Sequence, residues 1–184
     1  MSNSPEVKPK GRLAFMIGLP KSGKSSLARE WSMGRREFVS RRRAAAKSTR
    51  LRVIVCAARI RRALGHRWNS YAEGFVDATK HTMIRALLYD YDVVVDGTHT
   101  TRPSIQRMFE IDPEAEFFFV DTPPTVCKDN AVRAGREDLV PVIDRMAAQL
   151  LTLARADHWD DIADRMDGAV NAIRLLAWEQ GIED

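Results

Sequence analysis

The residues with the clearest chemical purpose form one short run between Gly18 and Ser26. Two glycines, a lysine and a hydroxyl in this run follow the spacing G-x-x-x-x-G-K-[ST], which is suited to cradling phosphate groups. Glycines let the backbone curl tightly, so that successive N–H groups point into one hollow. The predicted nucleotide-binding residues are Gly18, Leu19, Pro20, Lys21, Ser22, Gly23, Lys24, Ser25 and Ser26.

Two side chains of this P-loop motif have distinct expected roles. Lys24 is placed to reach the β- and γ-phosphates, and Ser25 to offer its hydroxyl to Mg²⁺. The positive end of the helix that begins here adds to the attraction for phosphate. The motif therefore predicts ATP and Mg²⁺ as the bound groups and Lys24 as a catalytic residue.

The segments on either side of the P-loop have the composition that it needs. Residues 13–17 are continuously apolar, which is typical of a strand buried on both faces. After the loop, Leu27 and Trp31 lie four residues apart, on one face of a predicted helix. The alternative, a surface turn rich in glycine and lysine, does not explain these flanks.

A second chemical position is Asp96, which ends the apolar run Asp92 to Asp96. A buried strand that delivers a carboxylate to its C-terminal end resembles a Walker B strand, where Mg²⁺ or its water lies. Apolar strands often end in aspartate, so this prediction depends on the position of the run behind a P-loop. We take Asp96 as a catalytic and metal-binding candidate, with Ser25 as the other metal ligand.

Strands and helices alternate along the chain. Strands are predicted at 13–17, 52–56, 92–96 and 116–120, and helices from 26, at 57–64, at 71–88, from 103, at 125–133, from 140 and at 157–179. Val76, Thr79, Met83 and Leu87 are the predicted buried stripe of the 71–88 helix. The pattern indicates an α/β fold of the P-loop NTPase, kinase-like class, with three α/β/α layers and a mainly parallel sheet of about four strands. Ligands of such a sheet gather at its C-terminal strand ends.

Length and composition set the domain organisation. The 184 residues suit one domain at 12–184, after a polar, disordered lead at 1–11. No apolar run approaches the roughly 20 residues of a membrane span. Cys56 and Cys127 lack metal-ligand spacing and indicate a reducing compartment. We therefore expect a cytoplasmic protein, from a bacterial cell or a phage-infected host, without a membrane partner; the oligomeric state is left open.

Basic residues are concentrated in the basic block, defined here as residues 35–67. This block holds twelve of the 29 Lys and Arg residues but only one of the 25 Asp and Glu residues, Glu37. A positive segment on an otherwise acidic chain is a footprint for a polyanion, and we favour nucleic acid, DNA first. A solvated basic loop and a set of arginines that grip only ATP are the alternatives.

Three segments together resemble the P-loop kinases related to the kinase domain of bacteriophage polynucleotide kinase. They are Gly18 to Ser26, Val95 to His99, and a third that runs from Phe119 through Asn130, Arg133, Val140 and Pro141 to Met146. The third is the most specific, because P-loop proteins at large do not share it. The resemblance implies a lid at about residues 125–140, whose Arg133 contacts the donor phosphates and neutralises charge on the transferred phosphoryl group.

The chain departs from this family on the acceptor side. His99 stands where family members usually have asparagine, and Ala58 stands at or near the aspartate that accepts the hydroxyl proton. No Asp or Glu lies between Glu37 and Glu73. Arg61 does match an arginine that holds an acceptor phosphate in the family. The predicted acceptor-binding residues are Arg59, Arg61, Arg62 and His99.

The general base is therefore open. The candidates are Asp96, Glu73, Asp77 and a neutral His99, although Glu73 and Asp77 also suit solvated partners of Lys80. A loose transition state also depends less on proton removal than on positioning and charge neutralisation.

Three functions compete. The first is an ATP-dependent kinase that phosphorylates a hydroxyl of nucleic acid, with a hydroxymethylated pyrimidine base of 5-hydroxymethyluracil type, as in phage DNA modification, favoured over a 5′-OH end by the missing aspartate. A base hydroxyl in duplex would have to be flipped out of the stack. The second is a small-molecule kinase that resembles gluconate, shikimate or antibiotic kinases. The third is a nucleotide-dependent switch or DNA-binding ATPase.

Overall fold

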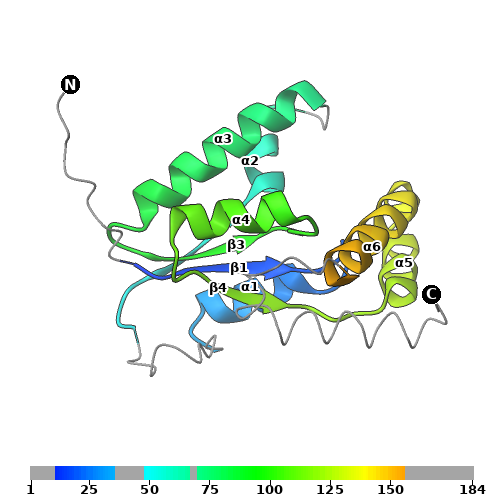
Figure 1. The fold of residues 1–184 in the computed structure, drawn as a ribbon, viewed down its shortest axis with the longest axis horizontal. Coiled ribbons are helices and arrows are strands. Elements are labelled where there is room, and N and C mark those ends of the chain that lie inside the picture. The colour runs from blue at the N-terminus through cyan, green and yellow to red at the C-terminus, as the bar shows by residue number, and fades with distance from the viewer. Residues whose placement is uncertain (1–10, 36–47, 67–69, 156–184) are drawn as a thin grey trace. The chain divides into compact units, whose positions relative to one another are not determined.

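A computed structural model describes residues 11–35, 48–66 and 70–155 of the chain (Figure 1). The elements are β1 (Leu13–Ile17), α1 (Lys24–Ser32), β2 (Arg52–Cys56), α2 (Ala57–Ala63), α3 (Ser70–Leu87), β3 (Asp92–Asp96), α4 (Arg102–Ile111), β4 (Glu116–Phe119), α5 (Pro124–Arg133), the 3₁₀ turn η1 (Glu137–Leu139) and α6 (Val140–Arg155). Their order and bounds confirm the predicted elements to within about two residues at most ends. The predicted helix at 157–179, the lead up to residue 10 and residues 36–47 of the basic block lie outside the described residues.

The four strands form one sheet with the order β2-β3-β1-β4. Strand β3 pairs in parallel with both neighbours, so that Val93 lies opposite Leu13 of β1 and Val53 of β2. All five residues of β1 are at most 3% exposed, which confirms the prediction of a strand buried on both faces. The α/β class with a four-stranded parallel sheet is confirmed.

The chain divides into two compact units that share strands β1 and β4. The first unit comprises residues up to 15, 27–96 and 108–117, and the second comprises residues 16–26, 97–107 and from 118 onwards. Each unit is described by itself below. The expected single domain over residues 12–184 stays a prediction. In the described ranges, no helix is long and apolar enough to cross a membrane.

In the first unit, α3 packs against α2 and the strands β2 and β3. Its buried residues lie four or eight positions apart, on one helical face: Ala72, Val76, Ile84 and, directly after the helix, Leu88. The predicted stripe is therefore wrong in part, because Met83 is 41% exposed. One residue along a helix corresponds to a turn of about 100°, so the branched side chain of Ile84 faces the core where Met83 was expected. At the start of β3, the buried Asp92 accepts a 2.9 Å hydrogen bond from the backbone N–H of Arg12.

In the second unit, α5 packs against α6 and the turn η1. The buried apolar residues of this pair of helices are Cys127 and Ala131 of α5 and Ile143, Leu150 and Leu153 of α6. An ion pair between Lys128 and Asp144, with 3.0 Å between nitrogen and oxygen, joins the two helices at their surface. The loop that follows β3 is tied to α6 as well, because the Thr100 hydroxyl donates to Gln149 Oε1 over 2.8 Å.

Candidate functional site

The P-loop lies between the end of β1 and the start of α1, within the second unit. Three of its residues have positive φ angles: 150° at Gly18, 64° at Lys21 and 97° at Gly23. The N–H of Gly18 donates to the carbonyl of Thr98 over 2.9 Å, which ties the start of the loop to the residue two places after β3. Repeated sign changes of φ are the geometry that turns neighbouring N–H groups toward one anion. The strand, loop and helix required by the motif are all present.

Lys24 is the first residue of α1, and only 6% of it is exposed. Its ammonium group donates to the carbonyl of Leu19 and, over 3.3 Å, to the hydroxyl of Ser22. Lys24 is therefore buried within the loop and not exposed to solvent. The loop folds around the side chain, and the lysine acts as an internal support of the loop as well as a candidate phosphate ligand.

The other predicted nucleotide-binding residues divide by exposure. Ser25 and Ser26, in the first turn of α1, are exposed, as is Gly23, next to which a Cβ would meet no atom within 4 Å. Leu19 and Ser22 are buried, with only 3% and 7% of each residue exposed, and Pro20 and Lys21 are half-buried. The hydroxyls and N–H groups at the start of α1 are thus the accessible part of the loop.

Two contacts that the sequence did not predict join the P-loop to the α5 segment, defined here as residues 122–133, which comprise α5 and the two residues before it. The Thr122 hydroxyl donates to the carbonyl of Ser22 over 2.8 Å, and the Asn130 side-chain amide donates to the carbonyl of Lys21 over 3.2 Å. Both donors belong to the third segment of the family resemblance, which was the available signal. The donor and acceptor residues are 100 positions apart in the first hydrogen bond and 109 in the second. No local sequence pattern could therefore reveal these pairings.

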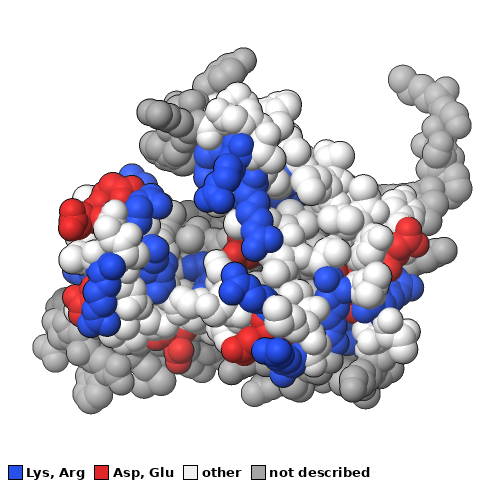
Figure 2. All heavy atoms as spheres, turned by 180° about the vertical axis from the view of Figure 1, so that it is seen from behind, with Lys and Arg blue, Asp and Glu red and all other residues white. Residues whose placement is uncertain are grey.

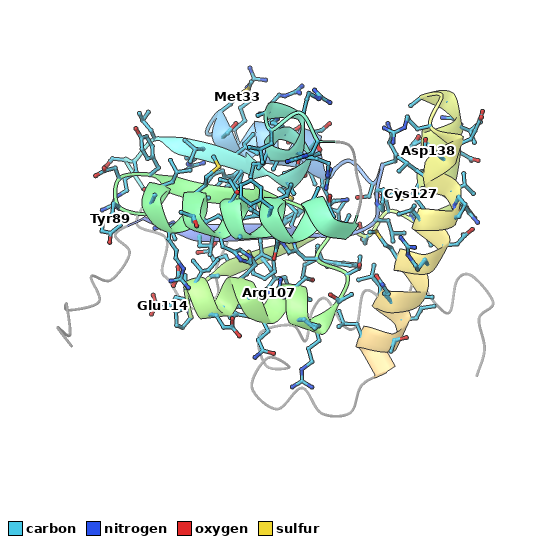
Figure 3. All side chains as sticks on the ribbon, turned by 90° about the horizontal axis from the view of Figure 1, so that it is seen from above. Met33, Tyr89, Arg107, Glu114, Cys127 and Asp138 are labelled. Carbon is cyan, nitrogen blue, oxygen red and sulfur yellow. The ribbon has the colours of Figure 1, made fainter. Side chains whose placement is uncertain are left out.

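Arg133, the predicted lid arginine, is the last residue of α5 and is exposed. It lies one helical turn after Asn130, on the same helix. Just beyond it, Arg136 and Asp138 form a two-fold hydrogen-bonded pair at 2.8 Å and 2.8 Å, and these hydrogen bonds lower the pKa of Asp138. Figure 3 shows the labelled Cys127 and Asp138 in this part of the second unit.

His99 lies inside the second unit, only 5% exposed, with a φ of 44°. Its Nδ1 is 2.6 Å from the carbonyl of Met16, so Nδ1 is the nitrogen that donates. A Cβ on Gly97 would lie 2.7 Å from the ring, which explains why a residue without a side chain stands there. This position gives His99 a structural role at the end of β1. A contact with the acceptor stays a prediction.

The predicted metal ligands are a serine hydroxyl and a carboxylate. Ser25 belongs to the second unit, and the half-buried Asp96, the last residue of β3, belongs to the first. Hard oxygen donors of these two kinds fit Mg²⁺, which keeps several waters and takes few protein ligands. In the parts of the chain that are described, no three His, Cys, Asp or Glu side chains are grouped to hold a metal ion. The magnesium site stays a prediction.

Among the described arginines of the basic block, some contact other residues of the protein and others are exposed to solvent. Arg52 donates to the carbonyl of Trp31 over 3.1 Å and stacks over its ring at 5.0 Å. Arg59 and Arg62 on α2 are exposed. Figure 2 shows Lys and Arg side chains in several groups on one face of the molecule, with fewer acidic residues between them.

Arg61 on α2 is held by a carboxylate of the neighbouring helix α3. Its Nε and Nη2 lie 2.6 Å and 2.7 Å from the two carboxylate oxygens of Glu73, and these hydrogen bonds raise the pKa of Arg61. The expected partnership with Lys80 is confirmed for Asp77, at 2.6 Å, and is wrong for Glu73, which pairs with Arg61. Glu73 therefore places a carboxylate against Arg61 of α2, three residues after Ala58 on that helix.

Comparison with known proteins places the fold. No family model matches the chain, and no curated protein matches it. Among solved structures, a chain of the Pnkp1/Rnl/Hen1 RNA repair complex matches 81% of this chain with a TM-score of 0.61 and 19% identity. A second structure of a Pnkp1/Rnl/Hen1 complex matches 67% of it with a TM-score of 0.50 and 22% identity, and a gluconokinase from Sinorhizobium meliloti matches 96% of it with a TM-score of 0.49 and 14% identity.

At these identities the similarity shows the fold alone, an α/β fold with a four-stranded sheet that the matched chains share. The aligned region covers 47% and 40% of the two matched chains from the Pnkp1/Rnl/Hen1 complexes, so this chain spans less than half of their length.

Proposed function

We propose that this chain is an ATP-dependent kinase that transfers the γ-phosphoryl group to a hydroxyl of nucleic acid. The observation that carries the proposal is the P-loop itself, folded around Lys24 between a fully buried strand and a helix. A neighbouring helix, α5, is bonded to this loop and ends in Arg133. Phosphate-cradling N–H groups, a lysine and a second cation on another element are the parts that phosphoryl transfer requires.

The nucleic-acid acceptor is supported by the α2 surface. Arg59 and Arg62 are exposed there, and residues 48–66 contain no Asp or Glu. Close to α2, Phe75 of α3 is 57% exposed and packs edge to face against the ring of His66, with 6.5 Å between ring centroids. Cations beside exposed aromatic rings suit a strand whose phosphates are held and whose bases stack. A neutral small acceptor has neither phosphates for these arginines nor a row of bases to stack on the exposed ring.

Of the two acceptor hydroxyls, we place the 5′-OH end of a polynucleotide first. The preference for a hydroxymethylated base came from the missing aspartate near Ala58, and Glu73 now supplies a carboxylate to the same helix through Arg61. One similar structure belongs to a complex described as an RNA repair complex, which supports a polynucleotide acceptor. The hydroxymethyl base remains the second candidate, since Ala58 and His99 depart from the family pattern. DNA and RNA are both open as substrates.

The proposed transfer forms one bond and breaks one. The acceptor hydroxyl oxygen bonds to the γ-phosphorus while the bond from that phosphorus to the β–γ bridging oxygen breaks, and ADP departs. The released proton passes to the general base, for which Glu73 is one candidate, and we assign the charge on the transferred group to Lys24 and Arg133. Mg²⁺, held by Ser25 and Asp96, would neutralise phosphate charge when bound.

Transfer from γ-labelled ATP to three acceptors tests the proposal. The acceptors are oligonucleotides with free 5′-OH ends, end-blocked DNA that contains hydroxymethylpyrimidines, and a mixture of nucleosides and sugars. Label on free ends supports the first candidate, and label on the blocked DNA supports the second. Label on the small molecules alone refutes the nucleic-acid acceptor, and no label on any acceptor refutes the kinase. Lys24→Met, which keeps the buried stem, should abolish transfer.

The role of Glu73 has its own test. If Glu73 is the base, Glu73→Gln, which keeps the shape and one hydrogen bond to Arg61 but cannot take a proton, should lower kcat by about 10²-fold or more. Glu73→Asp should retain most of the parent kcat. A parent-like kcat for Glu73→Gln would show that the base is another group.

Binding to nucleic acid should weaken steeply with salt. For a single strand, log K falls against log salt with a slope of about −0.7 for each phosphate contacted, and for a duplex with about −0.9. Arg59→Ala and Arg62→Ala should each reduce the slope by roughly one contact. A flat salt response would favour a small acceptor instead.

A further inference from the structure

Two consecutive carbonyl groups of the P-loop are each held by a side chain from the α5 segment. Lys21 accepts from the Asn130 amide over 3.2 Å, and Ser22 accepts from the Thr122 hydroxyl over 2.8 Å. All four residues are half-buried or buried, and all belong to the second unit. Two donors from one segment on two neighbouring carbonyls form a clamp on the backbone of the loop.

The clamp acts on the groups that bind phosphate. The carbonyl and the N–H of one peptide unit point in opposite directions, because the unit is planar and trans. Holding the Ser22 carbonyl toward Thr122 therefore directs the N–H of Gly23 to the opposite side. Which way this N–H points decides whether it can donate to a phosphate.

The loop needs such support because its conformation is unfavourable by itself. Lys21 has a φ of 64°, and this left-handed region is unfavourable for a residue with a side chain. Such residues persist only where the surroundings over-determine them. The Asn130 bond falls on the carbonyl of this same strained residue.

We propose that Thr122 and Asn130 are positioning residues that hold the P-loop in its phosphate-binding conformation. Since Asn130 precedes Arg133 by three residues on α5, the same bond couples the conformation of the loop to the placement of the lid arginine. The inference rests on the proposed nucleotide-binding role of the P-loop and adds two residues that the motif does not contain. It predicts that nucleotide affinity depends on side chains about 100 residues away from the motif.

The test is equilibrium titration of the full chain with a fluorescent ADP analogue and Mg²⁺, without acceptor, alongside thermal unfolding without nucleotide. Thr122→Val removes the hydroxyl at constant shape, and Asn130→Ala removes the amide. Losing one net hydrogen bond should weaken nucleotide binding about 2- to 13-fold in each variant. Thr122→Ser, which keeps the hydroxyl, should restore binding to within about two-fold of the parent value.

A matched control is Thr152→Val, because the Thr152 hydroxyl donates only within α6, to the carbonyl of Ala148 over 3.0 Å. Its nucleotide affinity should equal that of the parent protein. If Thr122→Val and Asn130→Ala unfold at lower temperature but bind nucleotide as the parent does, the two residues are merely structural and the inference is wrong. If the parent binds no nucleotide, the proposed function itself fails, which is a different and separately visible result.

Discussion

Three glycine-to-alanine substitutions separate the strain of the P-loop from its packing. Gly18 combines a φ of 150° with a crowded surrounding, because a Cβ there would lie 2.8 Å from the Val120 carbonyl oxygen. Gly23 has a φ of 97°, but a Cβ would meet nothing within 4 Å. Gly74, inside α3, has neither a positive φ nor a neighbour within 4 Å of a Cβ. From Gly74 to Gly23 the series adds a strained φ, and from Gly23 to Gly18 it adds a steric overlap.

The expected free energies follow from these geometries. A strained φ costs about 1–3 kcal/mol, and overlap with a backbone atom that cannot rotate away costs about another 1–3 kcal/mol. Gly18→Ala should therefore lose about 2–6 kcal/mol of unfolding free energy, and Gly23→Ala about 1–3 kcal/mol. Gly74→Ala should gain roughly 0.5–1 kcal/mol, because alanine favours the helix.

Thermal unfolding without nucleotide, followed by circular dichroism, measures the series. For a chain of this length, 1 kcal/mol shifts Tm by roughly 2–4 °C. Gly18→Ala should thus unfold lowest, at roughly 4–24 °C below the parent protein, Gly23→Ala next, and Gly74→Ala slightly above the parent. An equal Tm for Gly18→Ala and Gly23→Ala would show that the close approach to Val120 does not constrain the loop. A Tm of Gly18→Ala at the parent value would refute the assigned geometry of the P-loop.

Further outcomes follow from the other contacts. Arg133→Ala should lower kcat about 10³-fold or more with little change in Tm, because the side chain is exposed and acts on transition-state charge; an unchanged kcat in the transfer assay would remove it from the reaction. A double-mutant cycle on Arg61 and Glu73, measured by urea unfolding, should give a coupling of about 1 kcal/mol, and a value near zero would contradict the two-fold hydrogen bond. Burial raises the pKa of Cys127 to about 11, so at pH 8 iodoacetamide should modify Cys56 first, as peptide mapping will show. Equal labelling of both cysteines would contradict the burial of Cys127. Because the Cys127 thiol of the unfolded chain ionises near the usual pKa of 9.0, the free energy of unfolding should fall between about pH 9 and 11.

The arrangement of strands and helices could be read from the sequence because it depends on local patterns. Continuous apolar runs predict buried parallel strands, and β1 is the clearest example. The P-loop motif likewise carries its own conformation in its glycines. The stripe of α3 failed at Met83 because two apolar residues, Met83 and Ile84, compete for one face, and only the packing against the sheet decides between them.

The parts of the site that could not be predicted depend on contacts between distant segments. Thr122 and Asn130 reach back to the P-loop across about a hundred residues, and their types, Thr and Asn, are common at many surfaces. The burial of Lys24 follows from how the loop closes around it, which composition does not encode. Glu73 could be proposed as a base, but its bond to Arg61 required the packing of α3 on α2.

The order of the strands in the sheet has a consequence for how the chain folds. Strand β1 pairs with β3, and Leu13 of β1 lies opposite Val93, which comes eighty residues later in the chain. The other neighbour of β1 is β4, which comes later still. At a synthesis rate of about 5–20 residues per second, the apolar strand β1 waits about 4–16 s before its first partner is made. Pairing over such a separation also slows folding of the complete chain. We therefore expect newly made β1 to be the segment that chaperones shield first, and premature release to lead to aggregation through this strand.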